Sequence, residues 1–498
     1  MKRMPFNMGD RPLERKTRVI TVFLLAGFLL LPSLLGAEEV DQLLTRAKLG
    51  EIRAQVLLGR KYFRGDGVPK NYTEAYRWFA SAAERGNAEA QHRLGQMYAR
   101  GHGVVPDDAE AVKWYFLSAE QGYPEAQYDL GERTMRGGGV LRSEAEAAKW
   151  YRKAAEQGHA EAQHKLGLMY ANGQGGLRGD AEAAKWFRKA AEQGHGDAQR
   201  DLGFFYYTGR GVPRDYAAAM LWYRKAAERG NADAQNKLGL MYHEGKGAPK
   251  NYTEALKWLN ISAGKENAAA QYNLGWIYAS GSGVVRDDDA AVRWYFMSVE
   301  KGHPGAQYGL GVMYEGGRGV PKDEAKALQW YRKAADQGYA AAQTNLGIMY
   351  FEGRGTSRNY AEAAKWLRKG SEQGDSSAQA NLGYLYGNGL GVSRDNAEAA
   401  KWYRKAAEQG IPLAQTRLGE LYERGEGVPR DYIESAKWYR KAAEQGNAEG
   451  QNNLGSLYEN GKGVPQDNLE AMRLYRAAAD RGSMAARGNL ERLESLYE

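Results

Sequence analysis

A single period runs through almost the whole chain. The glycine of a Leu-Gly pair recurs every 36 residues without an insertion, and it does so twelve times. A fixed period of about 20 to 50 residues indicates a solenoid, because one unit is too small to bury a core alone and must stack on its neighbours. The sequence therefore predicts twelve stacked units over residues 51–482.

The first half of each unit reads as a helix. In the unit that begins near residue 414, apolar residues follow the spacing of one helical face: Ala414, Leu418, Leu421 and Tyr422. Gln415 is expected off this apolar stripe. Gly419 lies mid-helix, where glycine costs about 1 kcal/mol relative to alanine, so we expect the backbone of the next helix to approach closely there.

A glycine pair and a polar cap separate the two predicted helices. Gly425 and Gly427 should end the first helix, since glycine tolerates the left-handed conformation that follows a helix C-terminus. Asp431 is the expected N-cap of the second helix, and Glu434 three residues later predicts a capping box. The second apolar stripe has small residues where the helices cross: Tyr432, Ala436, Tyr439, Ala442 and Ala443.

At this level of detail the unit resembles the Sel-1-like repeat family, whose members are related to the tetratricopeptide repeats. It shares the pattern A-x-Q-x-x-L-G-x-x-Y-x-x-G-x-G-V-x-x-D-x-x-x-A-x-x-W-Y-x-x-A-A-x-x-G. The resemblance covers about nine tenths of the chain and implies an all-α, right-handed superhelical solenoid of twelve 36-residue helix-turn-helix repeats. It also implies a protein that binds or scaffolds other proteins, without naming a partner.

The N-terminal residues have the layout of an export signal. An apolar run over residues 19–31 follows six basic residues and precedes small residues that end at Ala37. This layout is typical of a secretory signal peptide over residues 1–37. An uncleaved anchor is the alternative, although the run is shorter than the ~20 apolar residues of a spanning helix. We therefore expect export to the periplasm, cell surface or medium, with membrane contact only through a retained leader.

The two ends of the repeat array are expected to be capping helices. Residues 38–50 match the second helix of a truncated unit, and residues 483–498 follow the first-helix register without its glycine. A second level of repetition lies above the 36-residue period. The segment from Trp114 to Ser118 recurs from Trp294 to Ser298, at an offset of 180 residues. Duplication of a five-unit block would place two similar surfaces on the solenoid.

Composition excludes several functional classes. The formal charge of +8 leaves only +4 outside the leader, spread over both signs, which is no electrostatic footprint for nucleic acid. There is no cysteine, so the disulfides of some family members, which have been linked to β-lactam hydrolysis, are missing. The Gly-x-Gly loops follow no strand and precede no Gly-Lys-Ser/Thr, which indicates helix stops rather than phosphate cradles.

The remaining candidate chemistry is weak. Three of the seven histidines follow the glycine that closes a unit: His159, His195 and His303. We expect them to form a turn or to cap a helix, and not to bind a metal. No ligand cluster stands out. We predict no cofactor, no metal and no catalytic residue.

One column of the repeat is informative for binding. The residue after Leu-Gly is apolar in seven successive units: Leu168, Phe204, Leu240, Trp276, Val312, Ile348 and Tyr384. Flanking units carry Arg60, Gln96, Glu132, Glu420 and Ser456 there. The apolar residues either pack between adjacent first helices or line a concave groove for a peptide. The groove hypothesis proposes these contact residues: Trp276, Phe204, Tyr272, Tyr308, Phe351 and Tyr384.

Taken together, the sequence predicts an exported, non-enzymatic interaction scaffold that binds a protein or peptide, host proteins included. An envelope assembly factor for exopolysaccharide or secretion machinery is the alternative. A β-lactamase-like hydrolase is the remote one.

Overall fold

The computed structural model describes residues 40–496, and this part of the chain consists of helices, turns and loops without a strand. Residues 40–48 are helical, and twelve pairs of helices follow. The first helices of the pairs are α2 (Ile52–Arg64), α4 (Ala88–Arg100), α6 (Pro124–Arg136), α8 (Ala160–Asn172), α10 (Gly196–Thr208), α12 (Ala232–Glu244), α14 (Ala268–Ser280), α16 (Pro304–Gly316), α18 (Ala340–Glu352), α20 (Ser376–Asn388), α22 (Pro412–Arg424) and α24 (Ala448–Asn460). The all-α solenoid of helix pairs is confirmed.

The second helices have the same length and a constant place in the unit. They are α3 (Tyr72–Glu84), α5 (Asp108–Glu120), α7 (Glu144–Glu156), α9 (Asp180–Glu192), α11 (Tyr216–Glu228), α13 (Tyr252–Gly264), α15 (Asp288–Glu300), α17 (Glu324–Asp336), α19 (Tyr360–Glu372), α21 (Asn396–Glu408), α23 (Tyr432–Glu444) and α25 (Asn468–Asp480). A short 3₁₀ turn, η1 (Gln174–Gly176), follows α8, and α26 (Met484–Glu494) follows the last pair.

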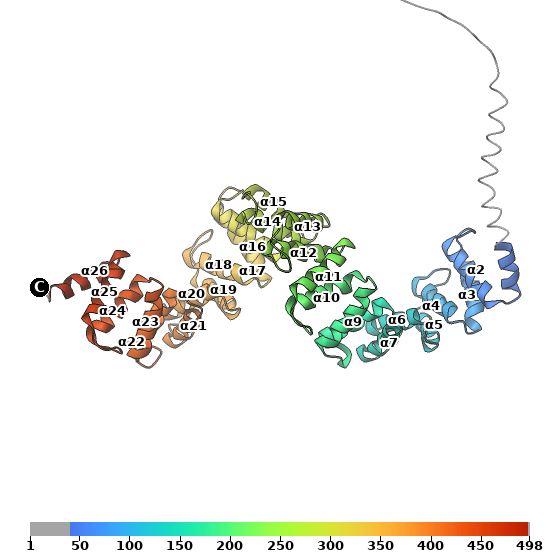
Figure 1. The fold of residues 1–498 in the computed structure, drawn as a ribbon, viewed down its shortest axis with the longest axis horizontal. Coiled ribbons are helices and arrows are strands. Elements are labelled where there is room, and N and C mark those ends of the chain that lie inside the picture. The colour runs from blue at the N-terminus through green and yellow to red at the C-terminus, as the bar shows by residue number, and fades with distance from the viewer. Residues whose placement is uncertain (1–39, 497–498) are drawn as a thin grey trace, which may run out of the picture. The chain divides into compact units, whose positions relative to one another are not determined.

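The described residues form two compact units. One ends at Ala234 and includes Lys246–Pro249, and the other contains Gln235–Gly245 and the chain from Lys250 onward. Within each unit successive helices pack on one another, as α2 does on α3 and α24 on α25, and their order can be followed along the coloured ribbon of Figure 1. Each repeat therefore completes its core with residues of its neighbours, as a solenoid must.

The mid-helix glycine makes room for an aromatic ring. A Cβ added to Gly419 would lie 2.6 Å from Cε1 of Tyr439, a ring buried in the second helix of the same repeat. In another repeat a Cβ on Gly59 would lie 2.8 Å from the ring of Phe79. The close approach expected here is thus real, but a side chain makes it where the sequence suggested backbone.

The glycine pair between the helices has two different tasks. Gly425 caps α22 in the left-handed conformation, with φ 72°. Gly427 also has positive φ, and a Cβ there would lie 2.1 Å from the carbonyl carbon of Asn396, at the start of the preceding repeat's second helix. The first glycine ends a helix and the second permits contact between repeats. In the closing column, Glu266 replaces glycine and keeps φ at 60°.

Two details of the predicted unit were wrong. Gln415 is not on a solvent face: it is 3% exposed, its Nε2 donates to the carbonyl of Ala407 at 3.1 Å, and its Oε1 accepts from Gln445 at 2.9 Å. Glu434 does not complete a capping box. Asp431 accepts from the backbone N–H of Glu434, but the Glu434 carboxylate pairs with Lys437 at 2.8 Å instead of reaching back.

Candidate functional site

The residue after Leu-Gly lies at the surface of the first helices and is buried in none of the seven apolar copies. Trp276 is 44% exposed, and Phe204 and Tyr384 are each 42% exposed. Their partial exposure favours the groove alternative over core packing. That a ligand uses this surface stays a prediction.

Charged residues are tolerated in this column because they have partners. Glu132 accepts hydrogen bonds from Lys165 at 2.9 Å and from the hydroxyl of Tyr151 at 2.7 Å. Glu420 pairs with Arg417 at 2.8 Å. The column is therefore a half-buried position that accepts either a paired charge or an apolar side chain, and the apolar copies leave part of that side chain uncovered.

Helices α14, α15 and α16 line a half-open cavity of about 260 Å³. We call it the aromatic cavity, and these residues line it: Tyr272, Trp276, Ala279, Ser280, Tyr295, Gly305, Tyr308, Gly309, Val312, Met313 and Arg318. Pockets for drug-sized ligands measure about 300–1,000 Å³, so this one fits a single large side chain. It brings together three of the predicted contact residues: Tyr272, Trp276 and Tyr308.

Neighbouring rings hold the cavity walls in place. His243, at the end of α12, contacts Trp276 edge-on with ring centroids 5.7 Å apart, and its Nε2 lies 3.2 Å from the carbonyl oxygen of Ser282. Tyr272 stacks on His303, with ring centroids 4.8 Å apart. The Trp276 side chain is thus exposed yet supported, which lowers the entropy that a partner would have to remove on binding.

The other predicted contact residues lie elsewhere. Phe351 and Tyr384 contact each other, with ring centroids 5.8 Å apart and an interplanar angle of 84°. Phe204 belongs to the unit that ends at Ala234, where its ring touches that of Phe205. None of these three lines the aromatic cavity.

Two glycines that sequence reasoning missed make room for rings that line the aromatic cavity. A Cβ on Gly309 would lie 2.7 Å from Cζ of Tyr295, and a Cβ on Gly305 would lie 3.0 Å from the ring of Tyr272. At the position of Gly309, other repeats carry residues such as Lys165, Asn273 or Asn345. This difference was visible in the aligned repeats, but its meaning depends on the ring that faces it.

Arg318 closes one side of the aromatic cavity and is already neutralised. It pairs with Asp288 at 2.7 Å and donates to the carbonyl oxygen of Ala279. Hydrogen bonds from Arg286 and Arg318 lower the pKa of Asp288 to about 2, so this carboxylate stays charged at neutral pH. The cavity therefore offers aromatic walls without a free positive charge at Arg318.

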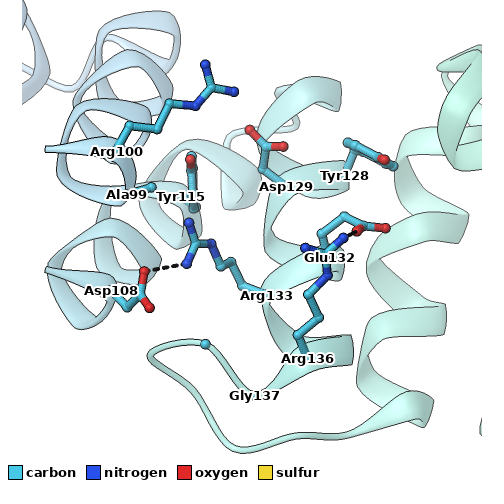
Figure 2. A pocket seen from close by; sticks show the side chains of 11 residues that line it. Ala99, Arg100, Asp108, Tyr115, Tyr128, Asp129, Glu132, Arg133, Arg136 and Gly137 are labelled. Atoms are coloured by element: carbon cyan, nitrogen blue, oxygen red, sulfur yellow. Dashed lines mark hydrogen bonds and ion pairs between the residues drawn. The ribbon is translucent and has the colours of Figure 1, made fainter. Parts of the chain in front are cut away.

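A second cavity, of about 540 Å³, lies between α4, α5 and α6. We call it the polar cavity, and these residues line it: Ala99, Arg100, Asp108, Tyr115, Tyr128, Asp129, Glu132, Arg133, Arg136, Gly137 and Gly138. Figure 2 shows Arg133 reaching Asp108 and Arg136 reaching Glu132. Asp129 accepts from Nε2 of the buried His92 at 2.9 Å. Most of its charges are paired with one another, so a ligand would have to break existing contacts.

The unit-opening histidines are helix caps, as expected. Nδ1 of His159, His195 and His303 accepts the backbone N–H three residues on, at 3.2, 3.1 and 3.3 Å. Burial lowers the pKa of His303, which favours the neutral ring that an accepting Nδ1 requires. In residues 40–496 no group of three His, Asp or Glu side chains is placed to hold a metal ion.

The described residues form a helical-repeat solenoid. The model of the Sel1 repeat matches twelve consecutive segments, from residues 52–87 to residues 448–483. The chain belongs to the Sel1 repeat family, whose members generally serve as protein-interaction scaffolds.

Two solved structures are similar to the chain. A protective antigen of uropathogenic Escherichia coli, described as displaying an SLR fold, shares 37% identity over 92% of this chain and 94% of its own, with a TM-score of 0.67. A Sel1 repeat protein from Oxalobacter formigenes shares 35% identity over 62% of this chain and 90% of its own, with a TM-score of 0.47. No curated protein matches the chain.

Proposed function

We propose that this chain is an exported, non-enzymatic scaffold that binds a protein partner through the aromatic cavity of α14–α16. The observation that carries the proposal is Trp276, a large aromatic side chain that is 44% exposed beside a cavity and supported by His243. Binding energy at protein interfaces concentrates in a few such aromatic anchors. Tyr272 and Tyr308 extend the anchor surface into the cavity.

Export is supported by the basic, apolar and small-residue layout of residues 1–37, which lie outside the described residues. The similarity to a protein described as a protective antigen is consistent with a location outside the cytoplasm. In the described part of the chain, no helix combines the length and apolar character needed to cross a bilayer. Cell fractionation tests this part of the proposal, and full-length protein confined to the cytosol would reject it.

The binding site is tested with a matched pair of substitutions. A partner is first captured on the chain that starts at Glu38, and its affinity is then measured by calorimetry for Trp276→Ala and for Gln96→Ala. Gln96 occupies the same column 180 residues earlier. We expect Trp276→Ala to weaken binding by about 2 kcal/mol or more, and Gln96→Ala to leave it unchanged.

Unfolding by denaturant is measured on the same two variants. Because Trp276 is exposed, its replacement should change stability little. Unchanged affinity together with a lowered unfolding midpoint would instead assign Trp276 to packing, and the aromatic cavity would lose its anchor.

A further inference from the structure

The hydroxyl of Tyr295 lacks a partner that some of its counterparts have. In three other repeats the tyrosine at this position donates to a glutamate 16 residues earlier, as Tyr439 does to Glu423 at 2.8 Å and Tyr475 to Glu459 at 2.7 Å. The residue 16 positions before Tyr295 is Ala279, which offers no side-chain acceptor. No hydrogen bond of the Tyr295 hydroxyl is found to any residue within 40–496, although the residue is only 4% exposed.

The missing acceptor coincides with the aromatic cavity. Both Tyr295 and Ala279 line it. Gly309 also lines it, and a Cβ there would lie 2.7 Å from Cζ of Tyr295, the ring carbon that carries the hydroxyl. Gly309 therefore makes room for the hydroxyl end of the buried Tyr295 ring, and Ala279 offers that hydroxyl no side-chain acceptor.

We infer that the aromatic cavity binds the side chain of a tyrosine in the partner, whose phenol forms a hydrogen bond with the hydroxyl of Tyr295. This inference rests on the proposed function and adds the kind of residue that the site recognises. Tyr272, Trp276 and Tyr308 supply ring faces and edges against which an aromatic ring packs.

The Tyr295 hydroxyl makes binding of an apolar side chain in the cavity unfavourable. A phenylalanine or leucine side chain would displace water from the cavity and leave this buried hydroxyl without a partner, which is unfavourable. A charged side chain would lose its hydration among aromatic walls, and Arg318 already pairs with Asp288. A tyrosine side chain avoids both costs. Its ring is apolar and uncharged, and its hydroxyl can donate a hydrogen bond to the Tyr295 hydroxyl or accept one from it.

The test uses p-cresol and toluene, which reproduce the side chains of tyrosine and phenylalanine. Both are titrated against the whole chain by ligand-detected NMR. We expect p-cresol to bind about tenfold more tightly than toluene, because only p-cresol satisfies the Tyr295 hydroxyl. A purely apolar cavity would give the opposite order, since toluene leaves water more readily.

Two substitutions locate the effect. Tyr295→Phe keeps the ring and removes the hydroxyl, so it should abolish the preference for p-cresol, whereas Tyr115→Phe, at the same position of the polar cavity, should not. Gly309→Ala should abolish binding of both probes, because the added Cβ would displace the Tyr295 ring that lines the cavity, whereas Gly387→Ala should not, because a Cβ there meets its nearest neighbour at 3.7 Å. Circular dichroism confirms that each variant is folded.

A third probe, 3-methylindole, reproduces the side chain of tryptophan. Four results would overturn the inference: no binding of p-cresol, tighter binding of toluene than of p-cresol, tighter binding of 3-methylindole than of p-cresol, or a preference for p-cresol that survives Tyr295→Phe. These outcomes are separate from the proposed function. A partner that depends on Trp276 while p-cresol fails to bind would keep the scaffold and reject the tyrosine. Binding of p-cresol without a partner that depends on Trp276 would keep the tyrosine site and reject the proposed scaffold function.

Discussion

The polar cavity and the aromatic cavity occupy the same place in two five-repeat blocks, because most of their lining residues correspond at an offset of 180. They share a buried tyrosine, Tyr115 in one and Tyr295 in the other, and in both the position 16 residues earlier is an alanine. They differ in pairs of counterparts: Arg100 and Ser280, Asp129 and Gly309, Glu132 and Val312, Arg133 and Met313.

These few exchanges convert one kind of surface into the other. In the polar cavity the carboxylates of Asp108 and Glu132 are paired with arginines of the same wall. In the aromatic cavity Val312 and Met313, the counterparts of Glu132 and Arg133, have no charge to pair, and Gly309 has no side chain in place of Asp129. The repeat therefore separates two tasks: invariant glycines and mostly alanine or aromatic columns maintain the fold, and a small set of variable positions decides the chemistry of each cavity.

The largest expected effect tests what the two cavities have in common. Tyr115→Ala and Tyr295→Ala each remove a ring that is 3% and 4% exposed, respectively. Each should lower the free energy of unfolding by about 3–5 kcal/mol, because a large buried side chain is lost and a void remains. Denaturant unfolding followed by circular dichroism measures both. A loss below about 0.5 kcal/mol in either variant would show that its ring does not support the repeat.

A smaller effect is expected at the invariant glycine beside each cavity. A Cβ on Gly131 would lie 2.8 Å from the ring of Tyr151, and a Cβ on Gly311 would lie 2.5 Å from that of Tyr331. The overlap costs about 1–3 kcal/mol, and the better helix propensity of alanine offsets about 1 kcal/mol of it. Gly131→Ala and Gly311→Ala should therefore both lower the unfolding midpoint, by similar amounts.

Gly387→Ala is the matched control for this pair, because a Cβ at that helical position has its nearest contact at 3.7 Å. Its stability should be unchanged or raised by less than about 1 kcal/mol. If Gly131→Ala behaved like this control while Gly311→Ala did not, the two blocks would not share one packing rule.

The repeat unit was predictable from sequence, and the cavities were not. Gly425 and Asp431 could be assigned because a helix stop and an N-cap depend on a few adjacent residues. Gln415 could not, since periodicity alone sends a polar residue to solvent, and its buried acceptor is the carbonyl of Ala407 in the preceding helix. Contacts between repeats depend on how the repeats stack. The 36-residue period predicts that they stack, but it does not predict which residues come into contact.

The candidate site divides in the same way. The apolar column, with Trp276 in it, followed from aligning the repeats. The cavity beside it requires Gly309 on α16 to face Tyr295 on α15, and this depends on how one repeat packs on the next. The missing acceptor at Ala279 is also visible only once Tyr439 is known to donate to Glu423.

The smallest expected effect concerns pH and separates the two cavities by charge. Burial disfavours the Glu132 carboxylate, but hydrogen bonds from Lys165 and Tyr151 outweigh it, and the pKa of Glu132 lies below its ordinary value of 4.5. A lowered folded-state pKa adds stability above the unfolded-state value, and this stability is lost as the pH falls through the lower folded-state pKa. Its counterpart in the aromatic cavity, Val312, has no titrating group.

Glu132→Gln should therefore be less stable than the unsubstituted chain at pH 7 by about 1 kcal/mol or less, as expected for a partly exposed ion pair. The difference should shrink in acid, as the pH falls through the lowered folded-state pKa and the carboxylate takes up a proton. Val312→Ala provides the comparison, because its stability difference comes from apolar packing and should not depend on pH. The measurement is the free energy of unfolding of each variant and of the unsubstituted chain, at neutral and at acidic pH. A Glu132→Gln difference that stays constant with pH would mean that Lys165 and Tyr151 do not stabilise the charged form, and the polar cavity would then owe its stability to packing, as the aromatic cavity does.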